Sequence, residues 1–105
     1  MRKALLTLAL AALAAPAGAQ SLRYEGALVE ALRVHGCSFG LAEDGERVRF
    51  ARQVSRSLRV PAIEIADRRS PHYRALQAAI DSLEARGVLA VDRRGATLAL
   101  ADCGD

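Results

Sequence analysis

The sequence contains 105 residues and carries a formal net charge of +3, from 15 basic and 12 acidic side chains. Two of the basic residues, Arg2 and Lys3, belong to a predicted leader; the remaining chain keeps 13 arginines and all 12 acids, a side-chain charge of +1. Nucleic-acid-binding domains need a concentrated basic surface to neutralise phosphates. The overall charge therefore argues against nucleic acid as the ligand.

The first 19 residues have the organisation of a secretory signal peptide. Arg2 and Lys3 form a positive n-region, residues 4–15 are an apolar run, and residues 17–19 read Ala-Gly-Ala. The apolar run is shorter than the roughly 20 residues that a membrane-spanning helix needs. We expect cleavage between Ala19 and Gln20, which releases residues 20–105 as a single periplasmic or secreted domain without a transmembrane anchor.

The first helix of the mature chain is predicted over residues 22–35. Its apolar residues recur at helical spacing and form one stripe: Tyr24, Ala27, Leu28, Ala31 and Leu32. Gly36 follows in the position where a left-handed residue commonly ends a helix. Residues 37–45 contain glycines and an acidic pair, and they predict a brief extended piece followed by a loop.

The second helix is predicted over residues 46–58, and Pro61 prevents it from continuing much further. Its expected apolar side consists of Val48, Ala51, Val54 and Leu58, with Phe50 nearby. Residues 60–66 then alternate between apolar and polar, with Ile63 and Ile65 on one side and Glu64 on the other. This alternation predicts a short edge strand.

The third helix has the clearest boundaries. Ser70 supplies an N-cap hydroxyl, Pro71 fits the first helical turn, and the helix should end at Arg86 with Gly87 as its C-cap and Val88 in the accompanying apolar contact. Its expected buried face consists of Leu76, Ala79, Ile80 and Leu83. A hairpin should follow, with residues 88–91 against residues 96–101 and Gly95 taking a positive φ in the turn.

This order of elements predicts a mainly helical α+β domain, with a three-helix core capped by a C-terminal β-hairpin. It resembles the winged-helix domains at the level of fold, over residues 22–103. The resemblance implies that the extended piece after the first helix lies beside the last hairpin strand. It carries no function over, because one fold serves many functions.

The chain has two cysteines, Cys37 and Cys103. They are too far apart for a CxxC redox motif, and neither has a histidine or a second cysteine at a metal-ligand spacing. Small exported domains often carry disulfides, so we predict a structural Cys37–Cys103 disulfide. The winged-helix resemblance also implies this pairing, because it brings the extended piece next to the end of the last strand.

The two histidines give little sign of catalysis. His35 ends the first helix, where an imidazole can bond a free carbonyl group, and His72 is expected to be exposed in the first turn of the third helix. A nucleophilic pair of Cys37 and His35 is conceivable, but oxidation to a disulfide removes the thiol. We therefore predict no enzymatic activity, no catalytic residues, no metal and no cofactor.

The most distinctive surface feature is a set of four arginines on the second helix, called the arginine row: Arg49, Arg52, Arg56 and Arg59. Steps of three, four and three residues place them on one helix face. The row is either an ordinary solvated face or a docking site for an acidic partner protein, an anionic headgroup or a polyanion. Arg93 and Arg94 at the hairpin tip would extend such a docking face.

The favoured hypothesis is a small exported, disulfide-stapled interaction or accessory domain that binds another envelope or extracellular protein. The alternative is a binder of DNA or another polyanion that uses the arginine row and the hairpin. A small hydrolase or redox enzyme is a third class, but no constellation of residues in the sequence supports it.

Overall fold

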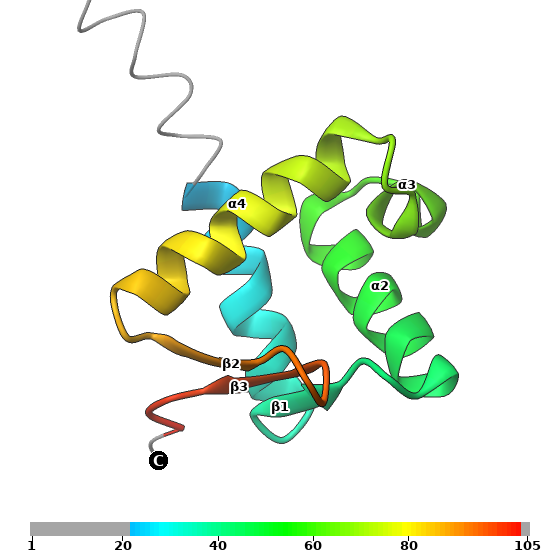
Figure 1. The fold of residues 1–105 in the computed structure, drawn as a ribbon. Helices are drawn as coiled ribbons and strands as arrows, with labels where there is room; N and C mark the ends of the chain where they lie inside the picture. The colour runs from blue at the N-terminus through cyan, green and yellow to red at the C-terminus, as the bar shows by residue number, and fades with distance from the viewer. Residues whose placement is uncertain (1–21, 104–105) are drawn as a thin grey trace, which may run out of the picture.

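A computed structural model describes residues 22–103 (Figure 1), so the predicted signal peptide and its cleavage site lie outside the described residues. The N-terminal helix covers residues 22–34. It is followed by β1 (Ser38–Gly40), α2 (Asp44–Leu58), α3 (Ala62–Ala66), α4 (Pro71–Ala85), β2 (Leu89–Asp92) and β3 (Thr97–Leu100). The described chain is therefore mainly helical α+β, as predicted. Within residues 22–103 there is no helix whose length and hydrophobicity would let it cross a membrane.

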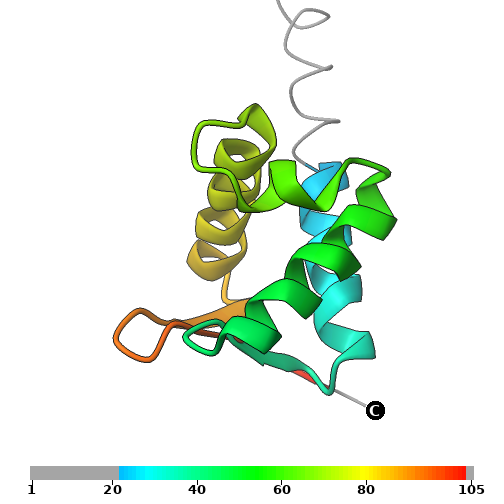
Figure 2. The same cartoon turned by 90° about the vertical axis from the view of Figure 1, so that its right-hand side faces the viewer.

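The three strands form one antiparallel sheet in the order β1-β3-β2. Phe39 of β1 and Val91 of β2 both lie opposite Leu98, because β3 occupies the middle of the sheet. Figures 1 and 2 show the sheet crossing one end of the helices. The expected neighbourhood of the extended piece and the last strand is thus confirmed, with a register that aligns residue 39 and residue 98.

The core is aliphatic, as the scarcity of aromatic residues requires. The largest side chains that are fully buried come from the N-terminal helix, β1 and α2: Leu28, Leu32, Phe39, Val54 and Leu58. Phe39 packs in the core against the edge of Phe50, with 5.1 Å between the ring centroids. These contacts fix the inner face of α2 and turn its opposite face to solvent.

The boundaries of α4 follow the sequence signals closely. The Ser70 hydroxyl accepts a hydrogen bond from the backbone N–H of His72 at 3.0 Å, and Pro71 occupies the first turn. At the other end Gly87 has φ +77°, and the backbone N–H of Val88 donates to the carbonyl of Leu83 at 2.9 Å. The hydroxyl cap and the glycine-terminated Schellman ending are the devices that the sequence predicts.

The predicted edge strand over residues 60–66 is wrong, because this segment forms the short helix α3. Pro61 is its N-cap, and the backbone N–H of Glu64 donates to the carbonyl of Pro61 at 3.0 Å. Side chains that are two residues apart on a helix are rotated by about 200° from each other. Ile63 and Ile65 therefore lie on opposite sides of α3. Ile65 is accordingly buried, whereas Ile63 is 77% exposed.

The hairpin turn differs from the prediction in one residue. Ala96 takes the positive φ, at 52°, in place of Gly95. Gly95 is needed for a close approach instead: its N–H donates to the Asp92 carboxylate at 3.3 Å, and a Cβ on Gly95 would lie 3.0 Å from the other carboxylate oxygen. The Asp92 side chain therefore organises this turn.

Cys37 and Cys103 form the predicted disulfide. Their Cα atoms are 5.9 Å apart, within the usual range for such a bond. The backbone reinforces this junction, because the N–H of Leu100 donates to the carbonyl of Cys37 at 2.9 Å. The bond ties the start of β1 to the segment that leaves β3.

Candidate functional site

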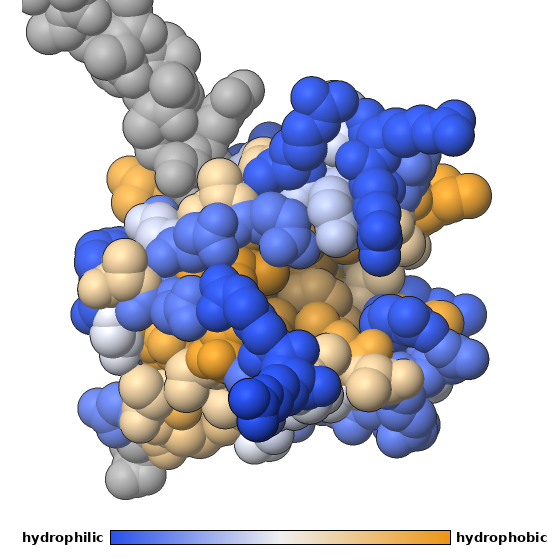
Figure 3. Space-filling model, in the orientation of Figure 1, coloured by the Kyte–Doolittle hydropathy of each residue, from blue (hydrophilic) through white to orange (hydrophobic). Residues whose placement is uncertain are grey.

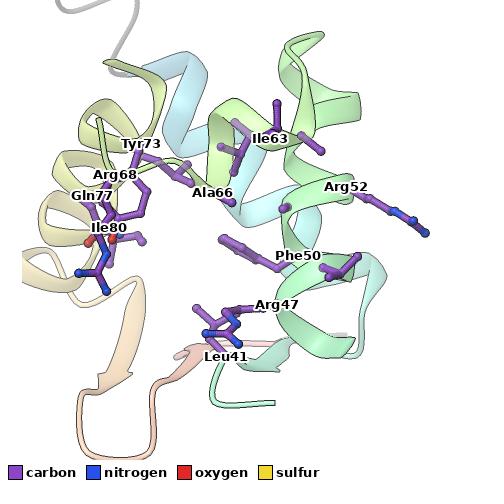
Figure 4. Close-up of a pocket in the computed structure, with 15 residues that line it drawn as sticks. Leu41, Arg47, Phe50, Arg52, Ile63, Ala66, Arg68, Tyr73, Gln77 and Ile80 are labelled. Carbon is purple, nitrogen blue, oxygen red and sulfur yellow. The ribbon is translucent and has the colours of Figure 1, made fainter. Parts of the chain in front are cut away.

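An apolar groove with a volume of about 460 Å³ opens between α2, α3 and α4. It is lined by residues of these three helices together with Leu41 and Arg68, and is called the groove below. Figure 3 shows it as a hollow of apolar surface bordered by hydrophilic side chains. Phe50 points into it from α2 (Figure 4), and the buried Ile65, Leu76 and Ile80 form its inner wall.

Two exposed apolar side chains lie at the mouth of the groove. Ile63 projects from α3 and is 77% exposed, and Val48 of α2 is 48% exposed. The sequence predicts Val48 on the buried side of α2, and this prediction is wrong. The core stripe of α2 consists of Phe50, Val54 and Leu58, and at about 100° per residue Val48 lies about 120° from its centre.

The charged side chains that line the groove are all arginines: Arg47, Arg52 and Arg68. Arg47 is bonded to the Asp44 carboxylate. Arg52 and Arg68 form no ion pair with any residue in the range 22–103. In Figure 4, Arg68 lies near Gln77 on the α4 side, whereas Arg52 points outward from α2. The border of the groove is therefore cationic.

Three members of the arginine row, Arg49, Arg52 and Arg56, lie opposite the core stripe of α2, whereas Arg59 is the C-cap residue after the helix, with a left-handed φ of 60°. All four of its side chains are exposed, and among the described residues none of them has a hydrogen-bond or ion-pair partner. Among the other described arginines, Arg47, Arg86 and Arg93 are paired with carboxylates, whereas Arg68 and Arg94, for example, have no such partner. The predicted docking role of the row stays a prediction, and Arg52 belongs to both the row and the groove.

A smaller hollow of about 230 Å³ lies beside the arginine row, where α2 faces the end of the N-terminal helix. Three arginines of the row line it together with His35 and Phe39. The His35 ring stacks on Phe39 with 3.9 Å between centroids, and its Nε2 is 2.7 Å from a Glu46 carboxylate oxygen. The expected bond from His35 to a helix carbonyl is therefore wrong, because the carboxylate takes its place.

His72 also departs from expectation. It is half-buried, and its Nδ1 lies 2.6 Å from the Tyr24 hydroxyl. This bond joins the first turn of α4 to the N-terminal helix, so the side chain has a structural partner. Cys37 has no free thiol, because its sulfur is bonded to Cys103 in the disulfide.

The hairpin tip contributes one paired arginine and one unpaired arginine. Arg93 donates two hydrogen bonds to the Glu84 carboxylate, at 3.0 and 2.9 Å, and lies 3.6 Å from Asp81. Hydrogen bonding by Arg93 lowers the pKa of Glu84, and the same bond raises the pKa of Arg93. The side chain of Arg94 has no partner within the described chain. An acidic ligand would therefore meet Arg94 unpaired and Arg93 already engaged.

Comparisons with protein-family models, with curated proteins and with solved structures each give no match to this chain. The candidate site is thus defined by its own geometry and charge. The sequence alone does not predict the groove, because its patterns place Ile63 in a strand and Val48 in the core. The local signal for the helix is Pro61, the N-cap of α3, because the fixed φ of proline is compatible with the entry into a helix.

Proposed function

We propose that the protein is a small exported interaction domain that binds another envelope or extracellular protein through the arginine row. The observation that supports this is the set of four exposed arginines without a carboxylate partner in residues 22–103. Side chains three and four residues apart on a helix are about 5–6 Å apart at Cβ, and like charges at that spacing are destabilising. Acidic residues of a partner would relieve this repulsion.

Export and the finer fold assignment belong to the same proposal. The n-region, apolar run and small-residue box of residues 1–19 support cleavage between Ala19 and Gln20. The disulfide is compatible with an oxidising compartment. The sequence of helices, short strand and C-terminal hairpin supports a winged-helix-like arrangement, with α3 inserted between the second and third predicted helices.

The test is affinity capture by the mature protein from its own envelope fraction. The double variant Arg52→Gln/Arg56→Gln should lose the captured partner. Its melting temperature should stay nearly unchanged, because exposed charge pairs contribute only about 0 to 1 kcal/mol each. The control Arg33→Gln/Arg69→Gln removes the same charge from exposed positions outside the row and should capture normally. Equal capture by both variants would make the row an ordinary solvated face.

A polyanion is the second candidate ligand. The three arginines of the row that lie on α2 span residues 49–56, about 10 Å along the helix axis, and a linear polyanion could contact them in succession. An electrophoretic shift with double-stranded DNA at low and moderate salt tests this. A shift that Arg52→Gln/Arg56→Gln abolishes, and that weakens steeply as the salt concentration rises, would favour the polyanion. The absence of a shift at low salt would exclude DNA.

A further inference from the structure

We propose that the groove binds one amphipathic helix of the partner protein, with its apolar side chains against Phe50 and its flanking carboxylates near Arg52 and Arg68. The inference rests on the proposed function and deepens it, because it names the kind of segment that the partner presents. It also adds a second contact surface, since the groove adjoins the arginine row at Arg52.

The free protein leaves apolar surface of the groove in contact with water. Ile63 of α3 and Val48 of α2 both line the groove and are exposed, and the buried Phe50 and Ile80 line it as well. Figure 3 shows the hollow as a continuous apolar area. A ligand with apolar side chains would remove this surface from water, which is the main favourable contribution to most protein associations.

The wall of the groove favours a helical ligand over an extended one. The groove is walled by α2, α3 and α4, and no residue of β1, β2 or β3 lines it. The wall therefore offers no strand edge with which an extended segment could pair. A helix satisfies its own N–H and C=O groups within the segment, so it can enter an apolar groove without leaving backbone groups unpaired.

The arginines of the groove favour a ligand that carries carboxylates. The lining contains three arginines and no acid, and Arg52 and Arg68 have no carboxylate partner in the described chain. These two residues lie on different elements, one on α2 and one between α3 and α4. Carboxylates on both flanks of an apolar helix face would meet them. A basic helix would be repelled.

The experiment measures fluorescence anisotropy of labelled peptides with the mature protein, residues 20–105. The first peptide has leucines at positions i, i+3, i+4 and i+7 and glutamates on both flanks of that face. The second has lysines in place of the glutamates, and the third has a central proline that breaks the helix. We expect the acidic helix to bind, and the other two to bind at least about tenfold more weakly.

Two substitutions with matched controls locate the binding. Ile63→Asp should weaken the acidic peptide at least about tenfold, whereas Leu22→Asp, at a residue that is 66% exposed outside the groove, should not. Arg68→Glu should weaken it and Arg33→Glu should not. All four sites are exposed, and circular dichroism with thermal melting checks that each variant is folded.

Several results would overturn the inference: no binding of the acidic peptide, equal binding by Ile63→Asp, or equal binding of the proline-broken peptide. If the protein binds anionic lipid vesicles but no peptide, and Ile63→Asp abolishes the vesicle binding, the groove would be assigned to a membrane surface instead. Envelope capture separates this inference from the proposed function. If the Arg52→Gln/Arg56→Gln variant loses the captured partner and the Ile63→Asp variant captures it normally, the groove inference is overturned and the row remains the docking site.

Discussion

Arginine side chains serve two purposes in this protein, and their neighbours decide which. Arg86 and Arg93 reach carboxylates on other elements and join those elements together. The arginine row lies on the outer face of α2 and, with Arg59, at its C-cap, where no carboxylate of the described chain reaches it. Charge is thus nearly balanced over the predicted mature chain, yet a local excess of positive charge remains on one helix face.

The Arg93–Glu84 pair makes a pH-dependent prediction. The hydrogen bond from Arg93 lowers the pKa of Glu84 below its ordinary value of 4.5. The pair's contribution to stability is therefore present in full above that ordinary value and is lost as the pH falls through the lowered pKa. In Arg93→Gln, an NMR titration should show the Glu84 carboxyl returning toward its ordinary pKa. Arg94→Gln is the neighbouring control and should leave Glu84 unchanged; an identical titration in wild type and Arg93→Gln would refute the assignment.

At the scale of elements, the sequence predicts a helix best where its end signals are local and chemical. The start of α4 depends on one hydroxyl and one proline, and its end on Gly87, so both boundaries could be predicted within a residue. α3 could not be predicted in the same way. Its five residues alternate in polarity, and only the placement of Ile65 against the surrounding core decides between strand and helix.

The same limit applies to the candidate site. The shared face of Arg49, Arg52 and Arg56 could be predicted because it needs only their spacing along one helix, whereas the left-handed conformation of Arg59 after α2 has no such local signal. The groove could not, because it exists only where three helices converge, and no local pattern shows which apolar side chains of α2 and α3 remain uncovered. Val48 and Ile63 illustrate the point, since both have the composition of core residues and both are exposed.

The helical form of α3 predicts a large difference between two isoleucines. Ile65→Ala should lower the free energy of unfolding by about 2 to 5 kcal/mol, because it empties a buried site. Ile63→Ala should change it by no more than about 0.5 kcal/mol, since this side chain is exposed. Denaturant unfolding of both variants measures the difference. Similar losses at the two positions would indicate that both face the core, as they would on one side of a strand.

At the scale of the whole molecule, the disulfide closes a loop that contains every described element after the N-terminal helix. Cys37 and Cys103 are 66 residues apart, and the bond joins the first strand to the segment after the last one. The small sheet and the disulfide together hold the end of the domain from which α2 departs. One wall of the groove and most of the arginine row therefore lie on a helix whose inner face is fixed by Phe50, Val54 and Leu58.

Reduction of the disulfide should therefore destabilise the whole domain. Closing a loop of this length restricts the unfolded chain by about 4 kcal/mol on the chain-entropy model, a large part of the roughly 5 to 15 kcal/mol that keeps a small domain folded. We expect a melting temperature lower by about 15 °C or more in the reduced protein. Non-reducing peptide mapping checks the pairing, and two free thiols in the exported protein would contradict it.

The central claim is that the outer face of α2 meets an acidic partner protein, and photo-crosslinking tests it most directly. Gln53→benzoylphenylalanine places the crosslinker in the hollow beside the arginine row and leaves all four arginines in place. Ala78→benzoylphenylalanine places it at an exposed position of α4 outside the groove. The account predicts one crosslinked protein at position 53, joined through an acidic segment, and none at position 78. The absence of a product at position 53, or the same products at both positions, would contradict it.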